Sequence, residues 1–128
     1  MKKLLDVAAV IEAATGLALM IYPPLLSNLL LGEGVSGAGM ALGRVAGFAL
    51  ISLGLACWLG LDSAGANNPA LIALLTYNLL ATLYLGYLGI DGRSVGTLLW
   101  PAVALHAVLT LLLARPLLAA VGVERVKR

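Results

Sequence analysis

The chain has 128 residues, of which 62% are hydrophobic and only 11% charged, and its mean hydropathy is +1.05. Soluble domains are about half apolar and a quarter charged, so this composition excludes an ordinary soluble domain and indicates an integral membrane protein. The net charge of +2 gathers mostly at the chain ends, which argues against a nucleic acid as partner.

The first apolar run predicts a membrane span over about 4–22, because Pro23 and Pro24 lack the amide hydrogens that would continue the helix. The leucine-rich segment after the prolines is too short to cross a bilayer and predicts a short interfacial helix. An N-terminal secretory signal is the alternative interpretation of the first run. Asp6 and Glu12 interrupt its apolar part, so we expect the segment to be retained as a helix.

Three further apolar runs predict spans over about 40–61, 70–89 and 98–114. A polar turn at 62–69 separates the first two of these, and its final proline suits the first position of a helix. Four crossings with short loops use nearly the whole chain. We therefore predict an all-α fold, an integral membrane up-and-down four-helix bundle, as a single transmembrane domain over 1–128.

Basic residues outside the spans lie almost entirely on one side of the predicted bundle, and only Arg93 falls in the opposite loops. The six on the first side are Lys2, Lys3, Arg115, Arg125, Lys127 and Arg128. Because cytoplasmic loops are rich in lysine and arginine, we expect both termini to face the cytoplasm. Tyr22, Tyr87 and Trp100 then lie near the outer interface and Trp58 near the inner one, as an aromatic belt.

Arg44 lies inside the second span, where an unpaired cation is unfavourable. A rise of about 1.5 Å per residue places it about 6 to 9 Å from the outer edge, and Glu12 about 12 Å from the inner edge. Glu12 is the only acid well inside a span, so we expect the two side chains to form a buried ion pair. The alternative is that Arg44 extends outward to lipid phosphates.

Other polar side chains fall at similar depths and predict two polar layers. Tyr84 and His106 share the outer layer with Arg44, whereas Asn78 shares the inner layer with Glu12. The candidate site comprises Glu12, Arg44, Tyr77, Asn78, Tyr84 and His106. This polar cluster is either a structural element that sets helix register or a ligand-binding site.

Small residues beside Arg44 predict close helix packing. Gly39, Gly43 and Gly47 repeat at four-residue spacing, which makes a groove that a second helix can approach closely. We therefore expect the second span to pack tightly in the bundle, with Arg44 next to the contact.

The chain has one histidine, His106, and one cysteine, Cys57. A metal or haem site needs more ligands than these, so we expect no metal and no cofactor, with His106 hydrogen-bonded to Thr110 or a tyrosine. Cys57 is interpreted as a small packing residue. No glycine-rich phosphate loop, paired carboxylates or Ser, His and Asp set occurs, so we expect no enzymatic activity.

Four stretches carry a family resemblance: IEAATGLALMIYPPLLSNLLLG, LGRVAGFALISLGLACW, LTYNLLATLYLGYLG and WPAVALHAVLTLLLAR. Together they resemble a group of small bacterial four-helix membrane proteins, broadly DoxX-like and uncharacterised. The resemblance matches an acid, a Gly-Arg pair, a Tyr-Asn pair and a histidine to Glu12, Gly43–Arg44, Tyr77–Asn78 and His106. It implies a location in the bacterial inner membrane and names no substrate.

These patterns favour a structural or accessory bundle in the lipid bilayer, with an internal polar pocket for a small or lipophilic ligand. A homo-oligomer or a membrane protein partner fits this interpretation. The alternative is a small oligomeric proton-coupled transporter that uses Glu12, since a carboxylate in the first helix is similar to that of the small multidrug resistance exporters. Only Glu12 and the glycines match that family, and Arg44 would compete with a cationic substrate.

Overall fold

The computed structural model describes residues 2–59, 68–93 and 95–126 of the chain. Its helices are α1 (Lys2–Ile21), α2 (Pro23–Leu31), α3 (Ala38–Leu59), α4 (Pro69–Asp91) and α5 (Leu99–Val126), and the described residues contain no strand. All helices except α2 include a segment long and apolar enough to cross a membrane. The predictions of an all-α fold and of four such helices are therefore confirmed.

Proline and glycine set most of the helix ends. Pro23 and Pro24 open α2 directly after Tyr22, and Gly32 ends that helix with a φ of +75°. Pro69 opens α4 as predicted, and Gly92 ends it with a φ of +73°. Residues 60–61 of the predicted second span, and 62–67 of the predicted turn, lie outside the described residues.

The last helix is much longer than predicted. α5 continues beyond Ala114 to Val126 and contains Pro116 in its interior. A proline removes one backbone hydrogen bond, but apolar packing continues on both sides of it. Leu113 is fully buried and Leu117 packs against the same cluster, so side-chain contacts hold the helix across the proline.

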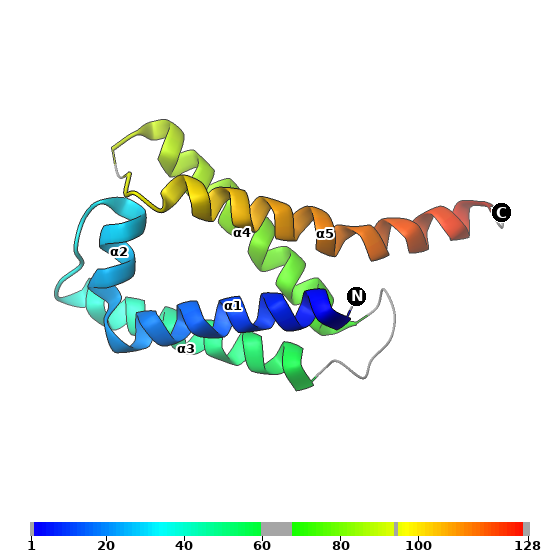
Figure 1. Cartoon of the computed structure of the whole chain (residues 1–128), viewed down its shortest axis with the longest axis horizontal. Helices are drawn as coiled ribbons and strands as arrows, with labels where there is room; N and C mark the ends of the chain where they lie inside the picture. Colours follow the sequence, from blue (N-terminus) through cyan, green and yellow to red (C-terminus); the bar gives the residue numbers. More distant parts are fainter. Residues whose placement is uncertain (1, 60–67, 94, 127–128) are drawn as a thin grey trace.

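The four long helices form two pairs that diverge from each other. α1 packs mainly against α3, and α4 packs mainly against α5 (Figure 1). Successive long helices alternate in direction, so the chain follows the predicted up-and-down order. The two pairs do not close into one compact bundle along their whole length, because α2 lies across the space between them at one end (Figure 1).

Backbone contact between glycines joins α1 to α3. A Cβ atom on Gly47 would lie 2.6 Å from the Gly16 carbonyl oxygen, and one on Gly54 would lie 2.8 Å from the Ala9 carbonyl oxygen. Gly43 faces Pro23 instead, and Gly39 faces Val35 of the preceding connection. The predicted glycine row therefore serves three different neighbours, and only Gly47 lies directly against α1.

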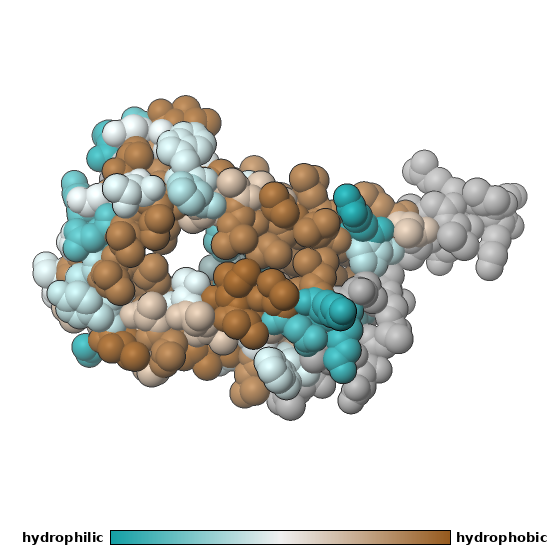
Figure 2. Space-filling model, viewed as in Figure 1, coloured by the Kyte–Doolittle hydropathy of each residue, from teal (hydrophilic) through white to brown (hydrophobic). Residues whose placement is uncertain are grey.

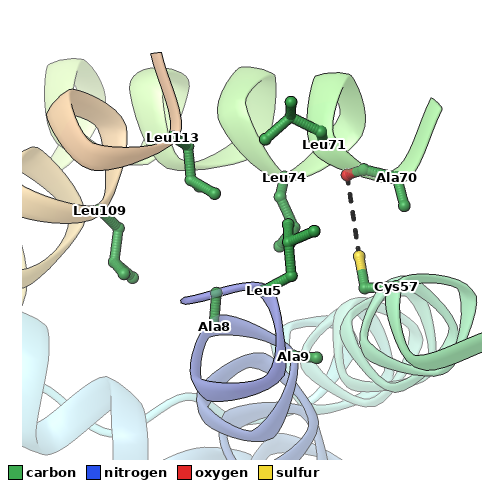
Figure 3. Packing of buried hydrophobic residues seen from close by; sticks show 9 residues of the cluster. All are labelled: Leu5, Ala8, Ala9, Cys57, Ala70, Leu71, Leu74, Leu109 and Leu113. Carbon is green, nitrogen blue, oxygen red and sulfur yellow. Dashed lines mark hydrogen bonds between the residues drawn. The ribbon is translucent and has the colours of Figure 1, made fainter. Parts of the chain in front are cut away.

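The apolar core lies at the end of the molecule where the chain starts. Its side chains come from all four long helices (Figure 3). They are Leu5, Ala8, Ala9, Cys57, Ala70, Leu71, Leu74, Leu109 and Leu113. The Cys57 thiol also lies 3.8 Å from the Ala70 carbonyl oxygen, which links α3 to α4. This cluster holds the two helix pairs together at one end only.

The opposite end is held by the backbone of α2. The amides of Gly96 and Leu98 donate to the carbonyl oxygens of Leu30 and Leu29, both at 2.8 Å. Gly96 allows this approach, because a Cβ atom there would collide with the Leu29 carbonyl group. The helix predicted as interfacial thus connects the first helix pair to the start of α5.

Candidate functional site

Glu12 of α1 is completely buried. Its Oε1 accepts a hydrogen bond of 3.4 Å from the Asn78 Nδ2 of α4, and its Oε2 is the one buried side-chain oxygen or nitrogen of the described residues without a hydrogen-bond partner. The Tyr77 hydroxyl interacts with the same carboxyl group but outside good hydrogen-bond geometry. A charged carboxylate here has no counter-ion among the described residues, so Oε2 needs a proton or a cation as partner.

Asn78 connects Glu12 to α5. Its Nδ2 also donates to the Leu74 carbonyl oxygen at 2.9 Å, and its Oδ1 lies 2.8 Å from His106 Nδ1. A backbone carbonyl can only accept, so the bond to Leu74 fixes which end of the Asn78 amide is the nitrogen. His106 Nδ1 must therefore be the donor in the bond to Asn78 Oδ1.

Glu12, Asn78 and His106 form a hydrogen-bonded series, here called the polar chain, and His106 lies half-buried at its end. Tyr77 packs edge-on against its ring, with centroids 5.8 Å apart and an interplanar angle of 81°. With the proton on Nδ1, a neutral imidazole carries its free lone pair on Nε2, which has no hydrogen-bond partner among the described residues. Thr110 bonds only to the His106 carbonyl oxygen, not to the ring as the sequence had suggested.

Helical spacing places the polar chain one turn from the apolar core. Leu5, Ala8, Ala9 and Glu12 follow one face of α1, and Leu71, Leu74 and Asn78 follow one face of α4. On α5, His106 precedes Leu109 and Leu113 by the same spacing. The polar chain Glu12–Asn78–His106 therefore closes the core on the side that faces α2.

A cavity of about 560 Å³ lies between the two helix pairs. Figure 2 shows an opening at this position, with hydrophobic residues on most of its border. All five helices contribute to the wall, and Leu26 and Leu30 of α2 lie at the end away from the core. Polar side chains on the wall are few. Thr15, whose hydroxyl forms no hydrogen bond with another described residue, lies toward the core with Tyr77 and His106. The other two are Ser27 and Tyr84.

The structure divides the predicted candidate residues differently from the sequence. Glu12, Asn78 and His106 are joined by hydrogen bonds, and Tyr77 contacts both ends of this chain. His106 thus belongs with the residues of the predicted inner layer. Tyr84 lines the cavity but is 64% exposed, so it lies at the rim, apart from the polar chain.

Arg44 is exposed and takes part in none of the ion pairs or hydrogen bonds of the described chain. The predicted pair of Arg44 with Glu12 is therefore wrong for this structure. The cause is the contact between α1 and α3: Gly43 and Gly47 face inward, which turns Arg44 to the outside. This position matches the alternative in which the side chain reaches lipid phosphates.

Within the described ranges, no three His, Cys, Asp or Glu side chains lie close enough to hold a metal ion. The arrangement can instead receive an apolar molecule and hydrogen-bond to one polar end of it.

Comparisons with family models, with curated proteins and with solved structures give no match for this chain.

Proposed function

We propose that this protein is a multi-pass membrane protein that binds a lipophilic small molecule between its two helix pairs. The observation that carries the proposal is the apolar cavity of about 560 Å³ with the polar chain at one end. Ligand pockets typically measure about 300 to 1,000 Å³ and have mostly apolar walls with a few polar groups. The cavity has both properties, and binding is a role that needs no catalytic residues.

The outer surface supports a place in the bilayer for the same chain. Large apolar side chains are exposed along all four long helices, and hydrophobic residues dominate the view in Figure 2. Soluble monomers rarely expose such a continuous apolar surface. We place the protein in the bacterial inner membrane, as the DoxX-like resemblance implies, with both termini cytoplasmic and α2 at the outer interface.

The alternative, a proton-coupled transporter that uses Glu12, has less support from the cavity. Glu12 is fully buried and is not part of the cavity wall, so a molecule in the cavity contacts Tyr77 or His106 instead. The unpaired Oε2 atom is the observation that favours proton chemistry. Transport would require uptake into vesicles that depends on a proton gradient and is lost in Glu12→Gln.

The binding proposal is tested by filling the cavity. Ala102 lines the cavity, whereas Ala104 on the same helix is exposed on its outer face. We expect Ala102→Phe to weaken the binding of an uncharged probe, a fluorescent fatty-acid methyl ester, at least about tenfold, because the added ring occupies the space of the ligand. Ala104→Phe is the matched control and leaves binding unchanged. The measurement is a titration of protein in lipid nanodiscs, with empty nanodiscs subtracted.

Thermal unfolding shows whether each variant is folded. Ala81 of α4 also lines the cavity, so Ala81→Phe replaces Ala102→Phe if the latter does not fold. Equal affinities of wild type, Ala102→Phe and Ala104→Phe would show that the probe binds outside the cavity and would exclude the proposal.

A further inference from the structure

We infer that the cavity selects an uncharged amphiphile whose hydroxyl group donates a hydrogen bond to His106 Nε2, with Asn78 as the residue that fixes the imidazole tautomer. This inference rests on the proposed binding function and names the chemical class of the ligand. The evidence consists of hydrogen-bond direction, the charge of the cavity wall and the location of the polar groups.

Hydrogen-bond direction makes Nε2 an acceptor. The Leu74 carbonyl fixes the Asn78 amide, whose Oδ1 then accepts from His106 Nδ1. In the neutral imidazole, the remaining ring nitrogen presents a lone pair and no hydrogen. A ligand ether or ketone oxygen cannot pair with it, whereas a ligand hydroxyl can.

None of the described residues that line the cavity has a charged side chain. The wall contains no Lys, Arg, Asp or Glu side chain, and Glu12 is shielded by being wholly buried behind it. An ionic head group in this space would lose its hydration without gaining a counter-ion, which is strongly unfavourable. The ligand class is therefore neutral.

Three polar wall groups lie together at one end, Tyr84 lies at the exposed rim, and apart from Ser27 the remaining wall is apolar. Thr15, Tyr77 and His106 belong to α1, α4 and α5 near the core, while α2 contributes leucines at the far end. Ser27 of α2 donates its only hydroxyl proton to the Pro24 carbonyl, so it offers a ligand an isolated acceptor oxygen and no donor. An amphiphile thus places its hydroxyl near His106 and its alkyl chain toward α2.

Two isomeric probes test this orientation in the full-length protein in nanodiscs. 1-Dodecanol and methyl undecyl ether have the same atoms, but only the alcohol has a hydrogen-bond donor. We expect the alcohol to displace the fluorescent probe with about tenfold higher affinity, the factor that one neutral hydrogen bond supplies. Dodecylammonium, the cationic analogue, should bind more weakly than the alcohol. Tighter binding of dodecylammonium would overturn the assignment of a neutral ligand.

His106 is the only histidine, so ¹⁵N-histidine labelling yields the signals of one imidazole. Wild type should show a protonated Nδ1 and an unprotonated Nε2, and only the alcohol should shift the Nε2 resonance. A proton on Nε2 in the ligand-free protein would contradict the tautomer, whatever the affinities are.

Asn78→Leu removes the acceptor that fixes the tautomer and keeps a side chain of similar size. We expect its preference for the alcohol over the ether to fall to about twofold or less, with the fluorescent probe still bound. Thr110→Val is the control, because Thr110 bonds only to the His106 backbone, and it should keep the full preference. If Asn78→Leu does not fold, His106→Phe tests the same loss of preference.

The failures of the two proposals are distinguishable. Loss of specific probe binding in wild type removes the binding function and this inference together. Probe binding that responds to Ala102→Phe, but with equal affinity for alcohol and ether, keeps the binding function and excludes the role of His106.

Discussion

Glu12 is buried on all sides, and its hydrogen bond comes from an amide on another helix rather than from a cation. An acid in such a position is tolerated when other polar groups share its environment, and Asn78 and Tyr77 do so here. Arg44 is on the outer face, where its charge remains available to water or lipid. At the residue scale, the two charges are therefore independent.

Double-mutant cycles check this independence. Glu12→Leu and Arg44→Leu should have additive effects on the free energy of unfolding, within about 0.5 kcal/mol, because the residues share no contact. Glu12→Leu with Asn78→Leu is the positive control and should show coupling of about 0.5 to 1.5 kcal/mol, as expected for one hydrogen bond. Thermal unfolding of the purified variants in one detergent provides the energies. Coupling above about 1 kcal/mol between Glu12 and Arg44 would restore the ion pair.

The helix pairs differ in how closely their backbones approach. α1 and α3 meet through glycines, with no side chain between the backbones at Gly16 and Gly47. In membranes this close approach is a main source of helix association, since lipid removes the hydrophobic driving force. We expect the contact between α1 and α3 to be the helix contact most sensitive to side-chain size.

Two equivalent substitutions measure that sensitivity. Gly47→Ala places a methyl group against backbone atoms of α1 that cannot move aside, so we expect a loss of about 1 to 3 kcal/mol in stability. Gly86→Ala, near the C-terminal end of α4, meets only a Val103 methyl group at 4.0 Å and should be neutral or up to about 1 kcal/mol stabilising. Both are read from thermal unfolding in the same detergent. Unchanged or raised stability in both variants would mean that the gain in helix propensity outweighs close packing at Gly47.

The whole molecule is closed at two ends and open between them. Nine core side chains hold the pairs together near the N-terminus, and two backbone hydrogen bonds attach α2 to the segment before α5 (Figures 1 and 3). Between these attachments the pairs leave the cavity. An arrangement of this kind keeps a ligand space without a rigid closed bundle around it.

The proposed orientation in the membrane rests on charge at the same scale. Arg93, the one basic residue predicted on the outer side beyond the spans, forms an ion pair with Asp91, Nε to Oδ2 2.7 Å, which raises the pKa of Arg93. Beyond the spans, Arg93 is thus the single basic residue on the predicted outer side, against six on the other side, and this asymmetry predicts the orientation. Ser36→Cys should react with a membrane-impermeant maleimide only from outside, and Lys3→Cys only from the cytoplasmic face. Native Cys57 is fully buried and supplies a low background. The reverse labelling pattern would invert the topology.

Length, composition and the positions of proline and glycine were enough to predict four long apolar helices and most of their ends. These properties are local: Pro23 and Pro69 mark helix starts whatever surrounds them, because each lacks an amide hydrogen. The sequence also indicated that Glu12 and Asn78 lie at the same depth, since both were counted from helix ends on the same side. Pro116 is the exception, because only tertiary packing decides whether a helix continues through a proline.

Only the tertiary structure decided which face of each helix is inside. In a membrane protein both the core and the surrounding lipid are apolar, so the sequence lacks the polar face that orients a helix in a soluble protein. The sequence therefore predicts that Arg44 faces inward, although the glycine contact turns it outward. The prediction of His106 in the outer layer is wrong for a related reason. The helical segment from Asn78 to Asp91 is longer than the segment from Leu99 to His106. The hydrogen bond between Asn78 and His106 therefore requires α5 to start about 9 Å below the end of α4. The cavity depends on the separation of the two helix pairs, which no single segment of the chain encodes.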